Sequence, residues 1–206
     1  RVIGVTGVGR DITERKKVEQ MLASETRVLE MMGSDAPLSA VLEEICRMIE
    51  GVSNGVLCAV MLLDDEGAHL RRGAGPSLPE TYMHAIDGMA IGPSCGSCGT
   101  AAFLGRQVIV EDIATDPFWA DFRDLALTHH LRACWSTPII SAAGKVLGTF
   151  SLYASTPRHP LDEWPIVARA SHLACLAIER KRTESALRLT QFSIQQAVDG
   201  VFWVSD

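Results

Sequence analysis

Residues 92–102, with the sequence GPSCGSCGTAA, decide the fold that we predict for this chain of 206 residues. Small and sulfur-containing side chains there lead into an apolar run that ends at Leu104 and Gly105, which predicts a short helix. The first amides of a helix have no partner inside it, and glycine lets another group approach them closely. The stretch therefore predicts a site for a negative or strongly polar ligand group at a helix N-terminus.

Two later motifs accompany this stretch. Residues 133–139 read ACWSTPI, and residues 146–153 read VLGTFSLY after the turn at 142–145. In this order, the three motifs resemble the ligand-pocket half of a GAF domain, a small-molecule sensor module of signalling proteins. The resemblance covers residues 35–180. It implies an α+β fold with an antiparallel sheet of about five to six strands flanked by helices. Long connector helices are expected at the N-terminal and C-terminal ends.

The hydrophobic pattern before the pocket region predicts a helix and two strands. Apolar residues recur every three or four positions over 38–52, as in an amphipathic helix. Residues 56–63 are apolar throughout, which is typical of a central strand buried on both faces. The turn at 64–67 then leads into a shorter antiparallel strand at 69–72.

The pattern after this hairpin predicts five further segments. Ile166, Ala170, Leu173 and Ala177 line one face of the last of these, a closing helix that we expect to continue through Leu187. The others are a short helix at 78–86, a strand at 107–111, a loop with a helical part at 116–130, and a hairpin of strands 134–140 and 146–153.

The two ends of the chain resemble parts of PAS domains. Residues 1–9 alternate like a final strand, and GRDITER at 9–15 resembles the signature that closes a PAS domain. At the other end, TQFSIQQAVDGVFWVSD at 190–206 resembles the opening helix and first strand of another PAS domain. We therefore expect a PAS end at 1–13, a connector helix at 14–33, a GAF domain at 34–182, and a connector with the start of a PAS domain at 183–206.

Composition excludes several classes of protein. The 19 basic and 25 acidic residues give a net charge of −6, and no long basic run predicts direct nucleic-acid binding. The longest apolar run is far below the roughly 20 residues that span a bilayer, and no signal peptide opens the chain. We expect a cytoplasmic fragment without membrane contact. The resemblance to GAF domains further implies that it binds an unidentified small molecule and forms a homodimer through its terminal helices.

The expected ligand-binding site lies between the start of the helix and the loop that carries Trp119. Aromatic side chains there offer apolar walls, although aromatics often fill a core under a long loop. The predicted site residues are Cys95, Gly96, Ser97, Cys98, Gly99, Thr100, Trp119, Phe122, Cys134, Trp135 and Ser136.

Six cysteines favour a reduced intracellular chain over a disulfide framework, because most lie in apolar stretches. The CGSC spacing at 95–98 is compatible with zinc, yet no second ligand pair is near, so we predict no metal. Cys98 is a candidate redox sensor, because a helix N-terminus favours its thiolate, and buried cysteine packing is the alternative. No cofactor is identified. Haem stays an alternative because some GAF domains bind it, whereas the cysteines do not resemble a bilin attachment site.

Catalytic motifs are missing from the sequence, so we expect no enzyme in this fragment. One alternative is the GAF-fold reductase that acts on free methionine sulfoxide, which also uses cysteines around its pocket. The resemblance implies a sensory domain that regulates a C-terminal output, most often a histidine kinase in a two-component phosphorelay. Input to a cyclic-di-GMP cyclase or phosphodiesterase, and a ligand-free dimerisation spacer, are the other readings.

Overall fold

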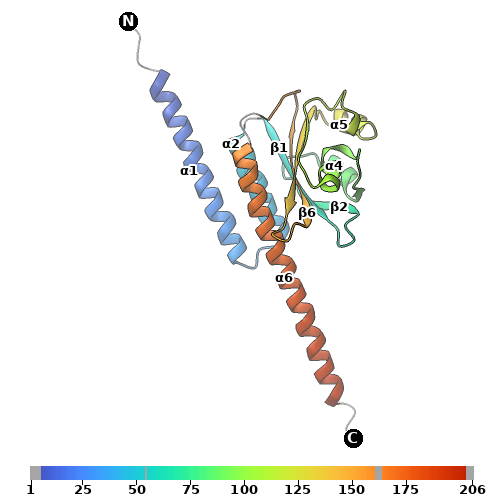
Figure 1. Cartoon of the computed structure of the whole chain (residues 1–206). Coiled ribbons are helices and arrows are strands. Elements are labelled where there is room, and N and C mark those ends of the chain that lie inside the picture. The colour runs from blue at the N-terminus through green and yellow to red at the C-terminus, as the bar shows by residue number, and fades with distance from the viewer. Residues whose placement is uncertain (1–5, 54, 161–163, 203–206) are drawn as a thin grey trace.

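A six-stranded antiparallel sheet forms the centre of the computed structural model (Figure 1). The structure describes the backbone of residues 6–53, 55–160 and 164–202, and side chains within 15–53, 55–160 and 165–192. The strand order is β3-β2-β1-β6-β5-β4, so the long strands β1 and β6 lie at the centre. The strands are β1 (Val56–Leu63), β2 (His69–Ala74), β3 (Met89–Ala90), β4 (Val108–Val110), β5 (Ala133–Ile140) and β6 (Val146–Ala154).

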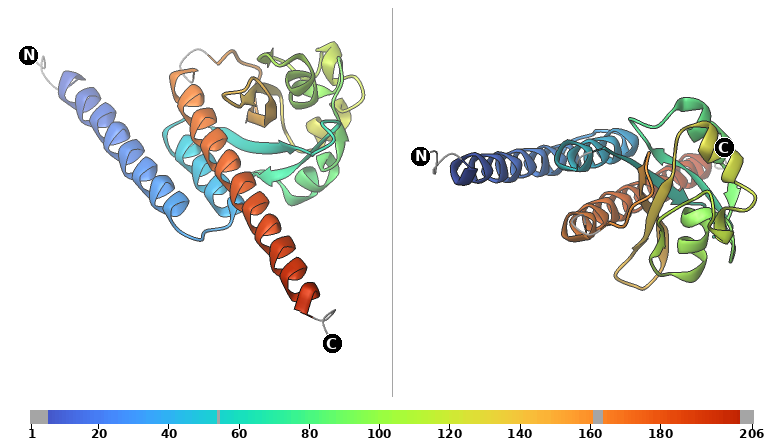
Figure 2. Two further views of the ribbon diagram at one scale, coloured as in Figure 1. Left: turned by 60° about the horizontal axis from the view of Figure 1, so that its bottom comes forward. Right: turned by 90° about the horizontal axis from the view of Figure 1, so that it is seen from above.

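Helices cover both faces of this sheet, which confirms the expected α+β architecture. Helices α2 (Leu38–Val52) and α6 (Trp164–Phe202) pack on one face and on each other, and two views in Figure 2 show them side by side. The opposite face carries α3 (Glu80–Ile86), α4 (Gly96–Leu104), the 3-10 turn η1 (Pro117–Trp119) and α5 (Arg123–Thr128). The molecule therefore has a helix layer, a sheet and a pocket layer.

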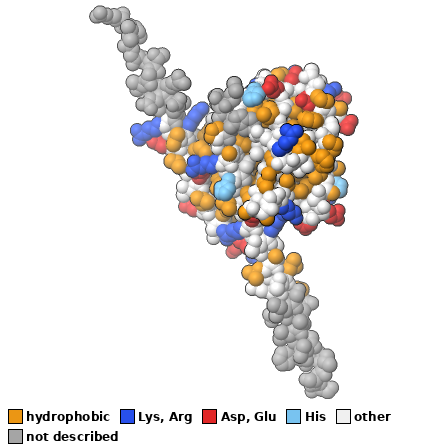
Figure 3. Space-filling model, in the orientation of Figure 1, with side chains coloured by type: hydrophobic (Ala, Val, Ile, Leu, Met, Phe, Trp, Pro, Cys, Tyr) orange, Lys and Arg blue, Asp and Glu red, His pale blue; other side chains and the backbone are white. Residues whose placement is uncertain are grey.

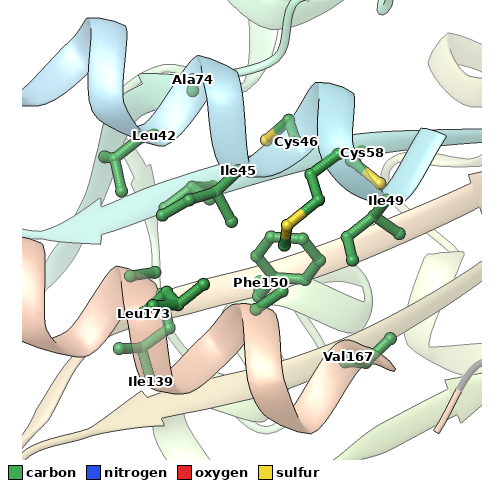
Figure 4. Close-up of a cluster of buried hydrophobic side chains, with 14 of the residues drawn as sticks. Leu42, Ile45, Cys46, Ile49, Cys58, Ala74, Ile139, Phe150, Val167 and Leu173 are labelled. Atoms are coloured by element: carbon green, nitrogen blue, oxygen red, sulfur yellow. The ribbon is translucent and has the colours of Figure 1, made fainter. Parts of the chain in front are cut away.

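The core between the helix layer and the sheet explains the confirmed helical pattern of α2. Leu42, Ile45 and Ile49 recur at helical spacing and are all fully buried. They face Phe150 of β6 and Leu173 of α6 (Figure 4). Each such side chain contributes roughly 1.5–3 kcal/mol to folding. This core fixes both helices to one face of the sheet.

A long N-terminal helix, α1 (Thr6–Gly33), lies against α2. The expected strand at 1–9 is wrong for Thr6–Gly9, which belong to α1, and residues 1–5 lie outside the described residues. A single strand needs a neighbour for its backbone hydrogen bonds, and within the described residues no strand pairs with Thr6–Gly9. An ion pair between Glu25 and Arg169 joins α1 to α6.

Helix α6 is 39 residues long and continues well beyond the domain (Figure 1). The helix expected at the start of 190–206 is part of α6, whereas the strand expected after it falls on residues that are either helical or outside the described part. Just beyond the domain, α6 exposes the apolar side chains of Leu187, Leu189 and Phe192. Figure 3 shows apolar side chains there, below the domain. No helix within the described residues is both long and apolar enough to cross a membrane.

Candidate functional site

The N-terminus of α4 forms an unusual turn that only glycine accommodates well. Gly96 has a φ of +59°, and a Cβ there would also touch the ring of Trp119. The Thr100 hydroxyl accepts a hydrogen bond from the amide of Cys95 at 3.0 Å, which closes the turn. Among the described residues, no group accepts from the amides of residues 96–98, as expected for a first helical turn.

A buried hydroxyl, that of Ser97, connects three elements. It accepts a hydrogen bond from the indole Nε1 of Trp119 at 3.0 Å and donates to the carbonyl oxygen of Cys134 at 3.1 Å. Ser97 is fully buried, and Trp119 is nearly so. Because both polar groups are satisfied, burial costs little, and the bonds hold η1 and β5 against α4.

The thiol of Cys98 lies against two hydroxyls of β6. Its Sγ is 3.1 Å from the Ser151 Oγ and 3.3 Å from the Tyr153 hydroxyl. Ser151 in turn lies 2.6 Å from the Ser136 Oγ of β5. All four side chains are buried. A thiolate accepts hydrogen bonds only, so these hydroxyls donate to Cys98 when it is ionised.

This environment separates the acidities of two neighbouring thiols. A hydrogen bond with the Cys134 thiol is the largest cause that lowers the pKa of Cys98, to about 6, against the opposing effect of burial. Hydrogen bonds with Ser151 and Tyr153 lower it further. Burial, followed by interaction with Cys98, raises the pKa of Cys134. Of the two thiols, Cys98 is therefore the one that ionises first as the pH rises.

A narrow cavity lies beside Cys98. About 10 Å³ of it admits the centre of a water molecule, which is roughly the space that one water needs. The lining is aromatic and apolar at one side and polar at the start of α4. It consists of Tyr82, Ile86, Met89, Gly96, Ser97, Cys98, Trp119, Phe122 and Tyr153. A ligand larger than water requires these walls to move apart.

The structure brings most of the predicted site residues together. Gly96, Ser97, Cys98, Trp119 and Phe122 line the cavity. The remaining residues lie behind this lining. Cys134 and Ser136 belong to the buried polar network, Gly99 and Thr100 are buried inside α4, and half-buried Cys95 has its Sγ against Gly92.

The prediction that Trp135 lines the pocket is wrong. Its side chain lies on the opposite face of the sheet, in the core with α2 and α6, under the guanidinium of Arg158 at 5.1 Å. Successive side chains of a strand point to opposite faces, so Cys134 and Trp135 cannot both face the pocket. The aromatic wall expected from Trp135 comes from Tyr82 and Tyr153 instead, whose rings meet edge to face at 5.7 Å.

Sequence reasoning missed the residues of β6 and of the α3–β3 segment. In β6 the polar side chains of Thr149, Ser151 and Tyr153 alternate with the apolar Phe150 and Leu152. This alternation is the signal for two different faces. Met89 of β3 also lines the cavity. No alternation could predict it, because β3 has only two residues.

Metal coordination has no candidate group here. Within the described ranges, no three His, Cys, Asp or Glu side chains are grouped so that they could hold a metal ion. The CGSC segment does not present two thiols to one point, since Cys95 lies against Gly92 while Cys98 faces β6.

Comparison with known sequences agrees with this geometry. A GAF domain family model matches residues 34–186. The chain is also similar to the methyl sulfide methyltransferase-associated sensor of Methanosarcina acetivorans, with 39% identity over 196 residues and 95% of the chain covered. It spans 20% of the length of that curated relative.

Two solved structures share the fold. One is a domain assigned to a two-component sensor histidine kinase of Sinorhizobium meliloti, with a TM-score of 0.61, 22% identity, and coverage of 75% of this chain and 99% of that one. The other is the free methionine-R-sulfoxide reductase of Neisseria meningitidis in complex with its substrate, with a TM-score of 0.61, 16% identity, and coverage of 82% and 91%. The family match, the strand order and the α4 pocket agree, and the chain belongs to the GAF domain family.

Proposed function

We propose that this chain is the sensory domain of a longer signalling protein, in which the α4 pocket responds to a small molecule or a redox change. Its output is a C-terminal histidine kinase in a two-component phosphorelay. The main observation that supports this proposal is the buried polar network that joins the pocket to the central strands. The matched relative is named a sensor, and one structural neighbour is assigned to a sensor histidine kinase.

The pocket lining favours one kind of ligand chemistry. None of the nine lining residues carries a formal charge, apart from Cys98 when its thiol ionises. The unpartnered amides at the start of α4 favour a small acceptor group, and Ile86, Met89 and Phe122 favour an apolar body. A small, mainly apolar molecule with one acceptor group fits this lining.

Transmission from the pocket runs through the sheet to the helix layer. Cys134 and Trp135 are neighbours in β5, so a displacement of β5 by the pocket also moves the core under α2 and α6. Helix α6 leaves the domain towards the C-terminus, and α1 is tied to α6 by Glu25 and Arg169. The signal is a population shift between two arrangements of these helices.

The flanking segments complete this proposal. PAS domains before and after the chain form a PAS-GAF-PAS array, in line with the sequence resemblance at 1–13 and 183–206. The exposed Leu189 and Phe192, three residues apart, lie on one side of α6 and give the connector an apolar contact for a second copy in a homodimer. In this arrangement the signal reaches the output domain along paired helices.

Phosphotransfer assays on the full-length protein that contains this chain test the proposal. With radiolabelled ATP, the protein acquires label on a histidine, seen as acid-labile and alkali-stable phosphate. Oxidation by hydrogen peroxide changes the labelling rate, and a Ser97→Ala pocket variant alters that response. Production of cyclic-di-GMP from GTP, or its hydrolysis, without histidine labelling assigns the output to the cyclic-di-GMP alternative. An output that ignores both the oxidant and the pocket variant identifies a spacer and refutes the sensory role.

A further inference from the structure

Two cysteines from different elements are buried on the pocket side of the sheet. Cys98 lies on α4, and Cys134 lies on β5, where it pairs in register with Tyr153. The Tyr153 hydroxyl is 3.3 Å from the Cys98 Sγ, and both cysteines belong to the same buried cluster on the pocket side of the sheet. The other cysteines lie elsewhere: Cys46 and Cys58 in the helix-side core, Cys175 on α6, and Cys95 against Gly92.

The two thiols differ in their access to the pocket. Cys98 lines the cavity, whereas Cys134 is fully buried behind it and does not reach the lining. The cavity has room for about one water molecule, so the walls need to move least for the smallest reagents that reach Cys98. This order, with an accessible thiol in front and a second thiol behind, suits a reacting cysteine and a resolving cysteine.

We propose that Cys98 and Cys134 form a reversible disulfide when a small hydroperoxide enters the pocket. This inference deepens the sensory function proposed above and rests on it. It names hydroperoxides as the oxidant class and a protein thiol or glutathione as the reductant class.

The reaction balances in two steps. The Cys98 thiolate attacks the outer oxygen of the hydroperoxide, the O–O bond breaks, and Cys98 becomes a sulfenic acid. The leaving oxygen takes a proton from the Tyr153 hydroxyl. Tyr153 then regains a proton from solvent, which balances the proton that Cys98 released when it ionised. The Cys134 sulfur then attacks the Cys98 sulfur and loses its proton to the departing hydroxide as water. Two thiols lose two electrons, and one hydroperoxide becomes an alcohol and water.

The bond shortens the contact between α4 and β5. A disulfide holds its sulfur atoms about 2.05 Å apart, which is closer than two sulfur atoms without a covalent bond can approach. Because Trp135 follows Cys134 directly and packs in the helix layer, this movement of β5 reaches α2 and α6. The thiol pair thus gives the pocket a covalent switch.

Peptide mapping after oxidation tests the disulfide. The Cys95→Ser variant is treated with hydrogen peroxide at neutral pH, blocked with iodoacetamide and digested with trypsin without reductant. Residues 73–106 and 133–145 form separate tryptic peptides, and with Cys95 replaced each carries one cysteine of the pair. We expect a linked product at the sum of their masses minus two hydrogens, which dithiothreitol abolishes. Oxidation products without this link overturn the proposal.

Two further variants test the separate roles of the two cysteines. In Cys134→Ala, the sulfenic acid on Cys98 persists and is trapped by dimedone; in Cys98→Ser, no label appears on Cys134. We expect Cys98 to react about tenfold faster than Cys175 of the same folded chain, because more of it is thiolate. Equal rates contradict the proposal. If the link fails but a bound small molecule still shifts the Trp135 signal by NMR, the sensory role stands without the disulfide.

Discussion

Cys134 and Trp135 are neighbours in β5, yet their side chains serve two different cores. Cys134 belongs to the pocket layer, with Ser97 and Cys98, while Trp135 lies in the helix layer with α2 and α6. A single backbone segment therefore touches both the candidate binding site and the helices that lead out of the domain. This relationship makes the sheet the physical link between ligand and output.

Loss of the Ser97 hydroxyl should destabilise the pocket. In Ser97→Ala, the buried indole nitrogen of Trp119 loses its acceptor, so we expect the free energy of unfolding to fall by about 1–3 kcal/mol. Urea denaturation measures this change. Ser94→Ala is the matched control, because Ser94 is exposed and bonds only the Pro117 carbonyl. Equal stability of the two variants would show that the buried bond is unimportant.

Ionisation of Cys98 should appear near neutral pH. The thiol deprotonates as pH rises through its lowered pKa of about 6, so thiolate absorbance at 240 nm increases between about pH 5 and 7. Burial raises the pKa values of Cys46 and Cys58, so they stay protonated in this range. Cys98→Ser should remove the step. A wild-type curve without any rise below pH 8 rejects the assigned charge.

Gly148 should tolerate no side chain. A Cβ at this position of β6 would overlap the carbonyl oxygen of Met61 in the neighbouring strand. We expect Gly148→Ala to lower the free energy of unfolding by about 2 kcal/mol or more, because the two central strands must separate. Gly33→Ala is the control, since nothing lies near its Cβ. Thermal unfolding followed by circular dichroism compares them, and a neutral Gly148→Ala is incompatible with the strand packing described.

The Glu25–Arg169 pair should hold α1 onto the domain. Glu25 is nearly buried, so Arg169→Met leaves a carboxylate without its partner. We expect amide hydrogen exchange in the described part of α1 to rise about tenfold, a loss of about 1.4 kcal/mol, while α4 stays protected. Arg180→Met, which removes an exposed pair within α6, should leave α1 unchanged. Unaltered exchange in α1 would remove this pair from the signalling route.

The sequence alone predicted the elements whose pattern is periodic or continuous. Helix α2 and strand β1 were found with their observed bounds, because one buries a helical stripe and the other buries both faces. The short β3 escaped, since two residues carry no period and the pairing with β2 is set by the tertiary fold. The strand expected at 1–9 followed an alternating pattern, whereas Thr6–Gly9 belong to α1 and pair with no strand among the described residues.

For the site, sequence motifs located the α4 turn but did not assign the sheet faces. Ser97 and Cys98 were named from the glycine-rich stretch itself. Trp135 was predicted as an aromatic wall of the pocket, although strand geometry sends its side chain to the other face. Tyr82 was absent from the prediction because α3 lies far from the motif in sequence and reaches the cavity only through folding.

Fluorine NMR of two tryptophans decides whether the pocket and the helix layer are coupled. In protein labelled with 5-fluorotryptophan, Trp119 reports the pocket and Trp135 reports the core under α2 and α6, with Trp→Phe variants giving the assignments. On oxidation of the thiol pair by hydrogen peroxide, we predict that both resonances shift together and return together with dithiothreitol. A Trp119 resonance that shifts while Trp135 stays fixed would contradict transmission through β5.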